Sequence, residues 1–342
     1  MTTSHTDKPV QAKDTRLDLI RVIACAAVVL LHVSARPFYM GDQISEKWWF
    51  LGNVISSLTH WCVPVFVMLS GALLLGSPKT QYPDILRRRV PRLLAVLIAA
   101  TILYGIWTKV ALGSFTWPAF WTSILDGQPY YHLYFFYLII GLYLIAPLLS
   151  RAVEILPEAT IKMAVIVTTL VTLVSFCWSV FSGRYTPNGS TFSWPYISYF
   201  LMGFYLYRYR PNLPYGAITV VAYLATVIGT QIMHYVPGPW GLFFFLYFSP
   251  TVYAFSLGIF GWLLLRSKSE PRRFVSFLAP MTLLVYVIHP IFMETLRRLY
   301  PIYTPGLMRL KYDLPLTFVA TLILSFAVAY LLRLIPVVRK FC

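Results

Sequence analysis

Residues 16–36 read RLDLIRVIACAAVVLLHVSAR, an apolar stretch long enough to cross a bilayer that nevertheless contains ionisable side chains. A helix of about 20 mainly apolar residues spans the hydrocarbon core of a membrane. Because a helix turns by about 100° per residue, four polar residues of this stretch share one face: Asp18, Arg21, Cys25 and His32. Ionisable side chains inside a spanning helix are costly and usually mark a substrate or ion path. We therefore predict that this polar face belongs to the functional site.

The same stretch has some features of a secretory signal peptide. Lys8 and Lys13 precede it, and Val33-Ser34-Ala35 near its end is similar to a cleavage site. A signal peptide has an uninterrupted apolar segment, whereas Asp18 and Arg21 interrupt this one. We therefore expect a retained membrane helix.

The composition extends this interpretation to the whole chain. Of its 342 residues, 58% are hydrophobic and only 12% are charged, and the mean hydropathy is +0.68. Soluble domains carry about 25% charged residues. Long apolar stretches recur, without the short alternating strands of a membrane barrel. The sequence predicts an all-α polytopic membrane protein with about ten transmembrane helices, at residues 17–36, 52–76, 92–112, 131–150, 160–181, 193–208, 215–234, 242–265, 274–295 and 315–336.

Lysine and arginine gather in alternate loops, which indicates the orientation in the membrane. Cytoplasmic loops are rich in these residues, and the basic residues 87–92 fall in the same set of loops as the amino terminus. We predict that both termini are cytoplasmic. Residues 1–16 then form an amino-terminal tail, residues 17–336 a transmembrane domain and residues 337–342 a carboxyl-terminal tail.

Several other functional classes are disfavoured. The net charge of +16 is explained by loops beside anionic lipid, so we predict no nucleic-acid partner and expect the lipid bilayer itself to be the main contact. The four cysteines form no CxxC pair, and no HExxH motif is present. We therefore expect no metal site.

Five histidines fall toward the outer side of the membrane in this orientation: His32, His60, His132, His289 and, as an expected interface or structural group, His234. An imidazole works as a general base near neutral pH, which suits proton abstraction from a hydroxyl group. His289 has polar neighbours at Tyr286 and Glu294, and we predict functional roles for it and for His32. His60 is expected to be a structural group, and for His132 both interpretations stay open.

A second concentration of charge is residues 84–92, which read DILRRRVPR and lead into the third predicted span. Arginine binds phosphate through two parallel hydrogen bonds. A polyphosphate ligand would be held well by several arginines at the start of a helix. The alternative is a plain anchor that faces the cytoplasm.

Taken together, these features resemble the acyltransferase-3 family of integral membrane acyltransferases. Asp18 to Arg21, with Arg21 and His32 eleven residues apart, is similar to the opening motif of that family. The further similar segments, in the family's order, are 64–71 (PVFVMLSG), 87–92 (RRRVPR), 131–136 (YHLYFF) and 286–290 (YVIHP). Two positions depart from the family pattern, since Tyr134 stands where tryptophan is usual and the serine that normally precedes the late tyrosine is missing.

The resemblance implies an O-acyltransferase whose transmembrane domain fills residues 17–336. It implies transfer of an acetyl group from cytoplasmic acetyl-CoA to a hydroxyl of a cell-envelope glycan or its lipid-linked oligosaccharide precursor, in a bacterial inner membrane. The chain is most similar to short stand-alone members, such as the O-acetyltransferase of enterobacterial common antigen. In the family the first-span histidine and arginine are the essential pair.

Site residues follow from the resemblance and the sequence together. We expect His32, Arg21 and Asp18 to be catalytic, with His32 as general base or as the carrier of a covalent acyl group. Coenzyme A would be held by Arg87, Arg88 and Arg92. The glycan would be bound by His289, Tyr286, Glu294 and His132.

Two alternatives belong to other classes. Ten spans with a buried aspartate, arginine and histidine also describe a proton-coupled transporter or flippase of an envelope precursor. The absence of an internal repeat and the ordered motifs disfavour that interpretation. A receptor or scaffold in a glycan assembly complex is the third option.

Overall fold

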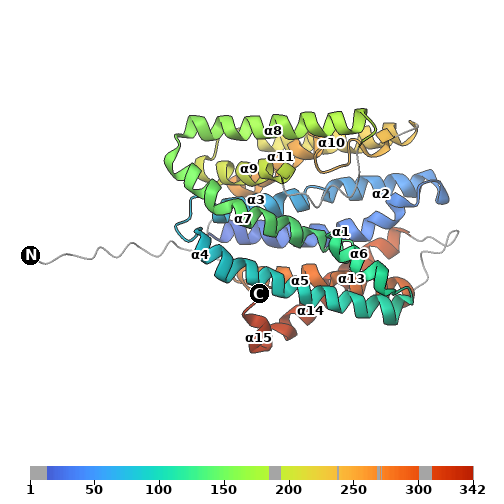
Figure 1. The fold of residues 1–342 in the computed structure, drawn as a ribbon. Helices are drawn as coiled ribbons and strands as arrows, with labels where there is room; N and C mark the ends of the chain where they lie inside the picture. The colour runs from blue at the N-terminus through green and yellow to red at the C-terminus, as the bar shows by residue number, and fades with distance from the viewer. Residues whose placement is uncertain are drawn as a thin grey trace, which may run out of the picture.

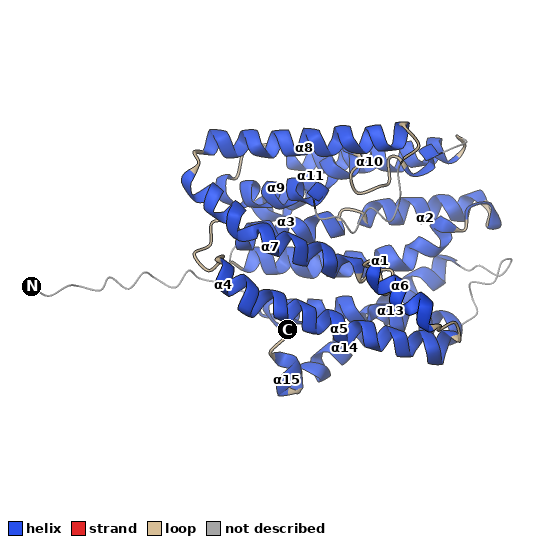
Figure 2. Ribbon diagram, in the orientation of Figure 1, coloured by secondary structure: helices blue, strands red, loops and turns tan. Residues whose placement is uncertain are grey.

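The computed structural model describes residues 14–184, 194–236, 239–267, 270, 272–299 and 310–341. Within these ranges the regular structure is helical, without a strand (Figure 2). The helices are α1 (Thr15–Tyr39), α2 (Glu46–Thr59), α3 (Cys62–Leu74), α4 (Tyr82–Asp84), α5 (Val90–Trp107), α6 (Trp117–Leu125), α7 (Tyr134–Ile155), α8 (Glu158–Phe181), α9 (Ile197–Tyr209), α10 (Tyr215–His234), α11 (Pro250–Arg266), α12 (Arg273–Leu278), α13 (Thr282–Leu299), α14 (Leu310–Leu334) and α15 (Pro336–Arg339). The long helices run alongside one another (Figure 1). The prediction of an all-α polytopic membrane protein is confirmed.

Each of the ten predicted spans overlaps one or two helices in the described residues, but not all of these helices reach spanning length. By length and apolar composition, 8 described helices or helix pairs suffice to cross a membrane. α11 has 17 residues and α9 has 13. At 1.5 Å per residue α9 is about 20 Å long, well short of the ~30 Å hydrocarbon core. The number of complete spans therefore stays a prediction.

The predicted tails differ slightly from the helix ends. Residues 1–13 of the amino-terminal tail lie outside the described residues, and α1 already begins at Thr15. At the other end α14 stops at Leu334, and the short helix α15 occupies Pro336–Arg339. Most of the predicted carboxyl-terminal tail is therefore helical or turn.

The second predicted span is broken in two at His60 and Trp61. Pro64 explains the break, because its ring clashes with the carbonyl of the residue four positions earlier and it has no N–H to donate. That earlier residue is His60, which directly follows α2, and α3 begins two residues later at Cys62. The break turns the His60 ring toward Phe245 and Tyr247, with ring centroids 3.8 Å and 4.5 Å away.

The two ends of the bundle differ in chemistry. We call the end where α1 starts the basic end, because it carries Arg16, Arg89 and Arg92. The carboxyl-terminal segment returns there, since Nε of Arg92 donates to the carbonyl of Phe341 at 2.8 Å. We call the opposite end, to which α1 carries His32, the histidine end.

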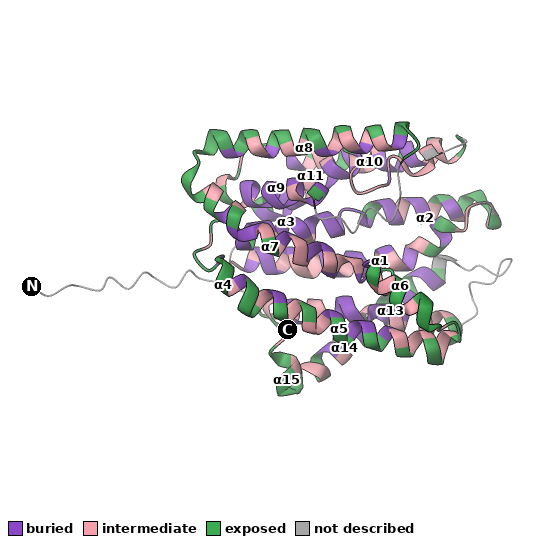
Figure 3. Cartoon of the chain, in the orientation of Figure 1, coloured by how far each residue is buried: buried purple, intermediate pink, exposed green. Residues whose placement is uncertain are grey.

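The centre of the bundle depends on a close contact between α3 and α9. A Cβ atom added at Gly71 would lie 1.8 Å from the carbonyl oxygen of Phe200, and one at Gly203 would lie 2.0 Å from that of Met68. Small residues at such crossings let membrane helices approach backbone to backbone. Buried residues concentrate on α1, α3 and α9, whereas α8 exposes much of its surface (Figure 3).

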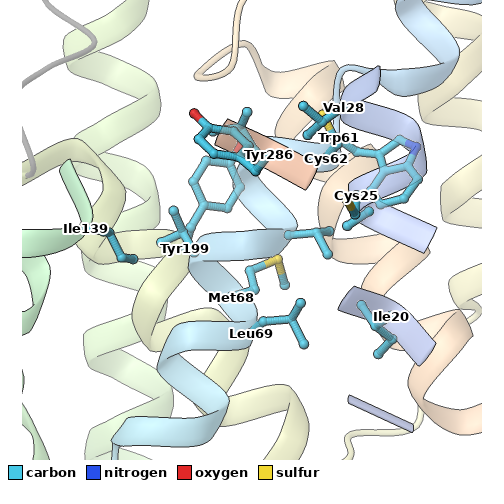
Figure 4. Close-up of a cluster of buried hydrophobic side chains, with 14 of the residues drawn as sticks. Ile20, Cys25, Val28, Trp61, Cys62, Met68, Leu69, Ile139, Tyr199 and Tyr286 are labelled. Carbon is cyan, nitrogen blue, oxygen red and sulfur yellow. The ribbon is translucent and has the colours of Figure 1, made fainter. Parts of the chain in front are cut away.

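The apolar core is continuous with this contact. Figure 4 shows part of it, with Ile20 and Cys25 of α1, Met68 and Leu69 of α3, and Tyr199 of α9. These helices are therefore fixed at the core, and they set the position of the polar face of α1.

Candidate active site

His32 of α1 pairs with His289 of α13 at the histidine end. Nδ1 of His32 lies 2.7 Å from Nε2 of His289, and the two rings stack with centroids 5.0 Å apart and planes 10° apart. His289 is fully buried, at 0% exposure. The helix pair thus joins two histidines that the sequence separates by 257 residues.

The hydrogen-bond network assigns the protons of both neutral rings. Nδ1 of His289 lies 2.8 Å from the carbonyl of Tyr286 and 3.1 Å from that of Val285. Carbonyl oxygens only accept, so Nδ1 of His289 carries the proton and its Nε2 is an acceptor. Nδ1 of His32 must then donate to His289, which leaves the lone pair of the imidazole on Nε2 of His32.

The local sequence explains why His289 adopts this arrangement. Pro290 follows it inside α13 and has no N–H to donate to the carbonyl four residues earlier. That carbonyl belongs to Tyr286, and the His289 ring donates to it instead. The His-Pro order therefore orients the ring.

His132 and Tyr286 form a layer around this pair. The hydroxyl of Tyr286 donates to the backbone carbonyl of His132, and Nε2 of His132 lies 3.3 Å from the carbonyl of Val287. The His132 ring is 5.5 Å from that of His289 and 6.4 Å from that of His32, centroid to centroid. We call Tyr286, His132 and His289 the barrier layer.

A cavity of about 430 Å³ opens beside His32, and we call it the histidine cavity. Its wall includes Tyr131, Tyr247 and Glu294. The carboxylate of Glu294 accepts from the hydroxyl of Tyr130 at 2.7 Å and from the indole N–H of Trp107 at 3.3 Å. Among the described residues, Nε2 of His32 forms no hydrogen bond, while its ring lines this cavity. The cavity therefore combines a free base, a fixed carboxylate and aromatic faces.

Two residues of this cavity were not predicted to be functional. Arg297 lines it and donates to the backbone carbonyls of His32 at 2.9 Å and Val33 at 3.2 Å, which ties α13 to α1. His60 lines it because of the break at Pro64. For Arg297 the only signal in the sequence was a charge near the end of a predicted span. For His60 there was a clearer signal, because Pro64 follows four residues later and predicts a break in the helix.

Arg21 and Asp18 form an ion pair at the other end of the polar face. Nη1 of Arg21 lies 3.3 Å from Oδ1 of Asp18, as the spacing of three residues permits. Asp18 is buried at 2% exposure. Arg21 lines two cavities, which meet at this residue and at Leu73.

The first of these cavities, about 320 Å³, extends from the basic end to the barrier layer. We call it the apolar cavity, because most of its wall is formed by residues such as Leu69, Phe135 and Phe136. Arg21, Arg89 and Arg92 line it, as does Tyr286. Among the described residues, none lines both this cavity and the histidine cavity, and the barrier layer links their walls.

The second, which we call the vestibule, measures about 990 Å³ and is lined by residues from the basic ends of α1, α3, α7 and α9. Its wall is mainly polar and includes Asp14, Arg208 and Arg210. A ligand that entered the vestibule would therefore meet charged groups before it reached the apolar cavity.

The arginines of residues 84–92 point to different surroundings because of the local helix geometry. Residues Ile85–Arg89 form a π-helical turn, which shifts the register that an ordinary helix would keep. Arg89 and Arg92 consequently line the apolar cavity, whereas Arg88 pairs with Asp84 at 3.5 Å and is 81% exposed. Arg87 is also exposed and lines none of the three cavities.

The structure thus distributes the predicted residues over three places. His32 and Glu294 line the histidine cavity, and His289, His132 and Tyr286 form the barrier layer behind it. Only Glu294 of the four expected glycan-binding residues lines the histidine cavity. Asp18, Arg21 and Arg92 lie toward the basic end, and Arg89 joins them there.

Comparison with known proteins places this geometry in a family. Residues 14–334 match the acyltransferase-3 family, described as an acyltransferase domain. No curated protein and no solved structure matches the chain. The matched range contains both ends of the polar face and every residue of the three cavities named above, and the chain therefore belongs to the acyltransferase-3 family of membrane acyltransferases.

Proposed function

We propose that this membrane acyltransferase moves an acetyl group from acetyl-CoA on the cytoplasmic side to a hydroxyl of an envelope glycan on the other side. The observation that carries the proposal is the tautomer of His32, whose free Nε2 faces a cavity on the opposite side of the barrier layer from the arginines of the basic end. The basic end faces the cytoplasm in this proposal, since lysine and arginine favour that side. The membrane is a bacterial inner membrane.

The donor enters through the basic end. Its diphosphate lies near Arg92 and the neighbouring Arg87–Arg89, and its pantetheine arm follows the apolar cavity past Arg21. From Arg21 to His32 the helix rises about 16 Å, a distance of the same order as that slender arm. The barrier layer must open to bring the thioester to His32, because the two cavities end on either side of it.

The chemical step uses His32 as general base. Its Nε2 removes the proton of the acceptor hydroxyl while the oxygen attacks the thioester carbonyl carbon. The tetrahedral intermediate collapses with cleavage of the C–S bond, and the imidazolium returns the proton to the coenzyme A thiolate. The products are an O-acyl ester and free coenzyme A. The acceptor lone pair of His289 stabilises the imidazolium through Nδ1 of His32.

The acceptor binds in the histidine cavity. Glu294, held by Tyr130 and Trp107, accepts hydrogen bonds from sugar hydroxyls. The faces of Tyr131 and Tyr247 pack against the apolar faces of a sugar ring. The acceptor is a glycan or a lipid-linked oligosaccharide, as for the stand-alone O-acetyltransferases that act on enterobacterial common antigen.

Purified protein in lipid vesicles, given radiolabelled acetyl-CoA and envelope glycans, tests this proposal. Label should reach the glycan, and His32→Ala should reduce turnover by roughly 100- to 10,000-fold while the protein still inserts and accumulates. His234→Ala is the matched control, because His234 stacks on Trp49 at the same end and lines none of the three cavities. Unchanged turnover in His32→Ala would refute the assignment, and solute flux without label transfer would identify a transporter.

A further inference from the structure

We infer that the nucleotide end of the coenzyme A thioester binds in the vestibule, with its ribose 3′-phosphate held by Arg208 and Arg210 at the end of α9 and its diphosphate near Arg92. This inference rests on the proposed donor and assigns a second binding segment to it. The vestibule adjoins the apolar cavity at Arg21 and Leu73, so one extended ligand can occupy both. Its volume of about 990 Å³ lies at the upper end of the range of ~300–1,000 Å³ found for cofactor pockets.

The charges of the vestibule leave two arginines available. Three acidic residues line it, and each already has a cationic partner: Asp14 pairs with Arg16 at 2.6 Å, Asp18 with Arg21 at 3.3 Å and Glu154 with Arg151 at 3.3 Å. Neither Arg208 nor Arg210 takes part in an ion pair within the part of the chain that the structure describes. A polar cavity with two uncompensated guanidinium groups favours an anion, and arginine matches phosphate with paired hydrogen bonds.

The carboxylate of Asp14 does not neutralise the positive charges of Arg208 and Arg210. Partial burial raises the pKa of its carboxyl, but hydrogen bonds and the charge from Arg16 outweigh this and hold the pKa below its ordinary value. Asp14 is therefore ionised and engaged with Arg16, and it also accepts from the hydroxyl of Tyr207 at 3.2 Å. Within the described part of the chain, Arg208 and Arg210 therefore form no ion pair with it.

The backbone at Arg210 supports a role for its side chain. Arg210 ends α9 in the left-handed conformation, with φ 48° and ψ 53°. Glycine is the usual residue at such helix ends, because a Cβ atom is strained there. Strained backbone of this kind concentrates at ligand-binding sites, where the side chain has a function that glycine cannot supply.

Coenzyme A titrations by calorimetry on purified protein in detergent test the inference. The variant combines Arg208→Gln with Arg210→Gly, which removes both charges and suits the left-handed backbone. Its dissociation constant for coenzyme A should rise roughly tenfold or more, since charge-assisted contacts to phosphate are lost. Arg208→Lys with Arg210→Lys should lose less, because the charges stay and only the paired geometry is lost.

Arg266→Gln is the matched control, since Arg266 is exposed at the end of α11 and lines none of the three cavities. It should bind coenzyme A like the native protein. If the native protein fails to bind coenzyme A, the proposed donor is wrong. If the native protein binds and the double Gln/Gly variant binds equally well, the vestibule assignment alone is overturned, and the arginines then serve the headgroups of anionic lipids.

Discussion

Nδ1 of His32 donates to Nε2 of His289, and His289 in turn donates to a carbonyl that Pro290 leaves without its helical partner. This series of hydrogen bonds ends at a backbone carbonyl of α13, which accepts a hydrogen bond but does not take up or release a proton. Among the described residues, the proposed base is therefore oriented by a neutral imidazole and a peptide group rather than by a carboxylate. A residue that acts in this way positions the base and does not touch substrate.

His289→Leu should lower kcat by roughly 10- to 100-fold, the usual effect of removing the partner that orients a functional imidazole. The KM for acetyl-CoA should stay within about twofold, because His289 lines none of the three cavities with a proposed substrate site. Steady-state acyl transfer measures both. His289→Gln keeps an acceptor for Nδ1 of His32 and should recover part of kcat. Equal losses for Leu and Gln would show that packing, rather than the hydrogen bond, is responsible.

Glu294→Gln should weaken the acceptor and leave the donor unaffected. The neutral amide is a poorer acceptor for sugar hydroxyls, and hydrogen bonds to charged groups contribute about 1.5–3 kcal/mol each. The KM for the glycan should rise about tenfold or more, as measured by varying glycan at saturating acetyl-CoA. Glu46→Gln is the control, because Glu46 accepts from Tyr235 outside the cavity. A matching rise in the KM for acetyl-CoA would place Glu294 on the donor path instead.

Arg21→Gln should reduce both activity and accumulation, since it removes the cation that forms an ion pair with the buried carboxylate of Asp18. Breaking a buried ion pair in this way costs roughly 3–5 kcal/mol, whereas neutralising both partners is often tolerated. The double variant Asp18→Asn with Arg21→Gln should therefore regain accumulation without regaining acyl transfer. Immunoblots of membrane fractions and transfer assays separate the two effects. Recovery of activity in the double variant would assign Arg21 a purely structural role.

Gly71→Ala should destabilise the bundle, because its Cβ would lie 1.8 Å from the carbonyl oxygen of Phe200. A backbone contact cannot be relieved by a rotamer change, and overpacking of a tight core costs about 1–3 kcal/mol or more. The midpoint of thermal unfolding in detergent should fall. Gly216→Ala on α10 should leave it unchanged or raise it, since the nearest atom of Trp262 is 3.6 Å away. Equal midpoints for the two variants would contradict the close-contact argument.

The sequence predicted most of the helices, because apolar length and polar breaks are local properties. It also placed Arg21 and His32 on one face of α1. The structure adds that they line two different cavities. The break between α2 and α3 was not predicted, although Pro64 was a visible signal for it. The sixth predicted span, residues 193–208, is the shortest of the ten, and α9 is shorter still because it begins at Ile197.

The candidate site was predicted only in part, since its geometry depends on contacts between distant segments. Nothing in the order of residues says that His289 meets His32, or that Arg297 binds the backbone of α1. Arg89 lines the apolar cavity and Arg88 does not, because the π-helical turn shifts the register of the helix. A prediction that assumes 3.6 residues per turn misses this shift. The orientation of the His289 ring could have been predicted from the sequence, because Pro290 acts locally by leaving one backbone carbonyl without its helical donor.

The barrier layer has a consequence for the energetics of the cell. A protein that hands a chemical group from one face of a bilayer to the other must do so without short-circuiting the proton-motive force. The Tyr286 hydroxyl donates to the backbone of His132, and the His132 and His289 rings lie within hydrogen-bond distance of backbone carbonyls, so packed side chains and backbone separate the two cavities. Under the proposed function, the same three side chains separate the activated donor from the water of the histidine cavity and oppose leakage of protons.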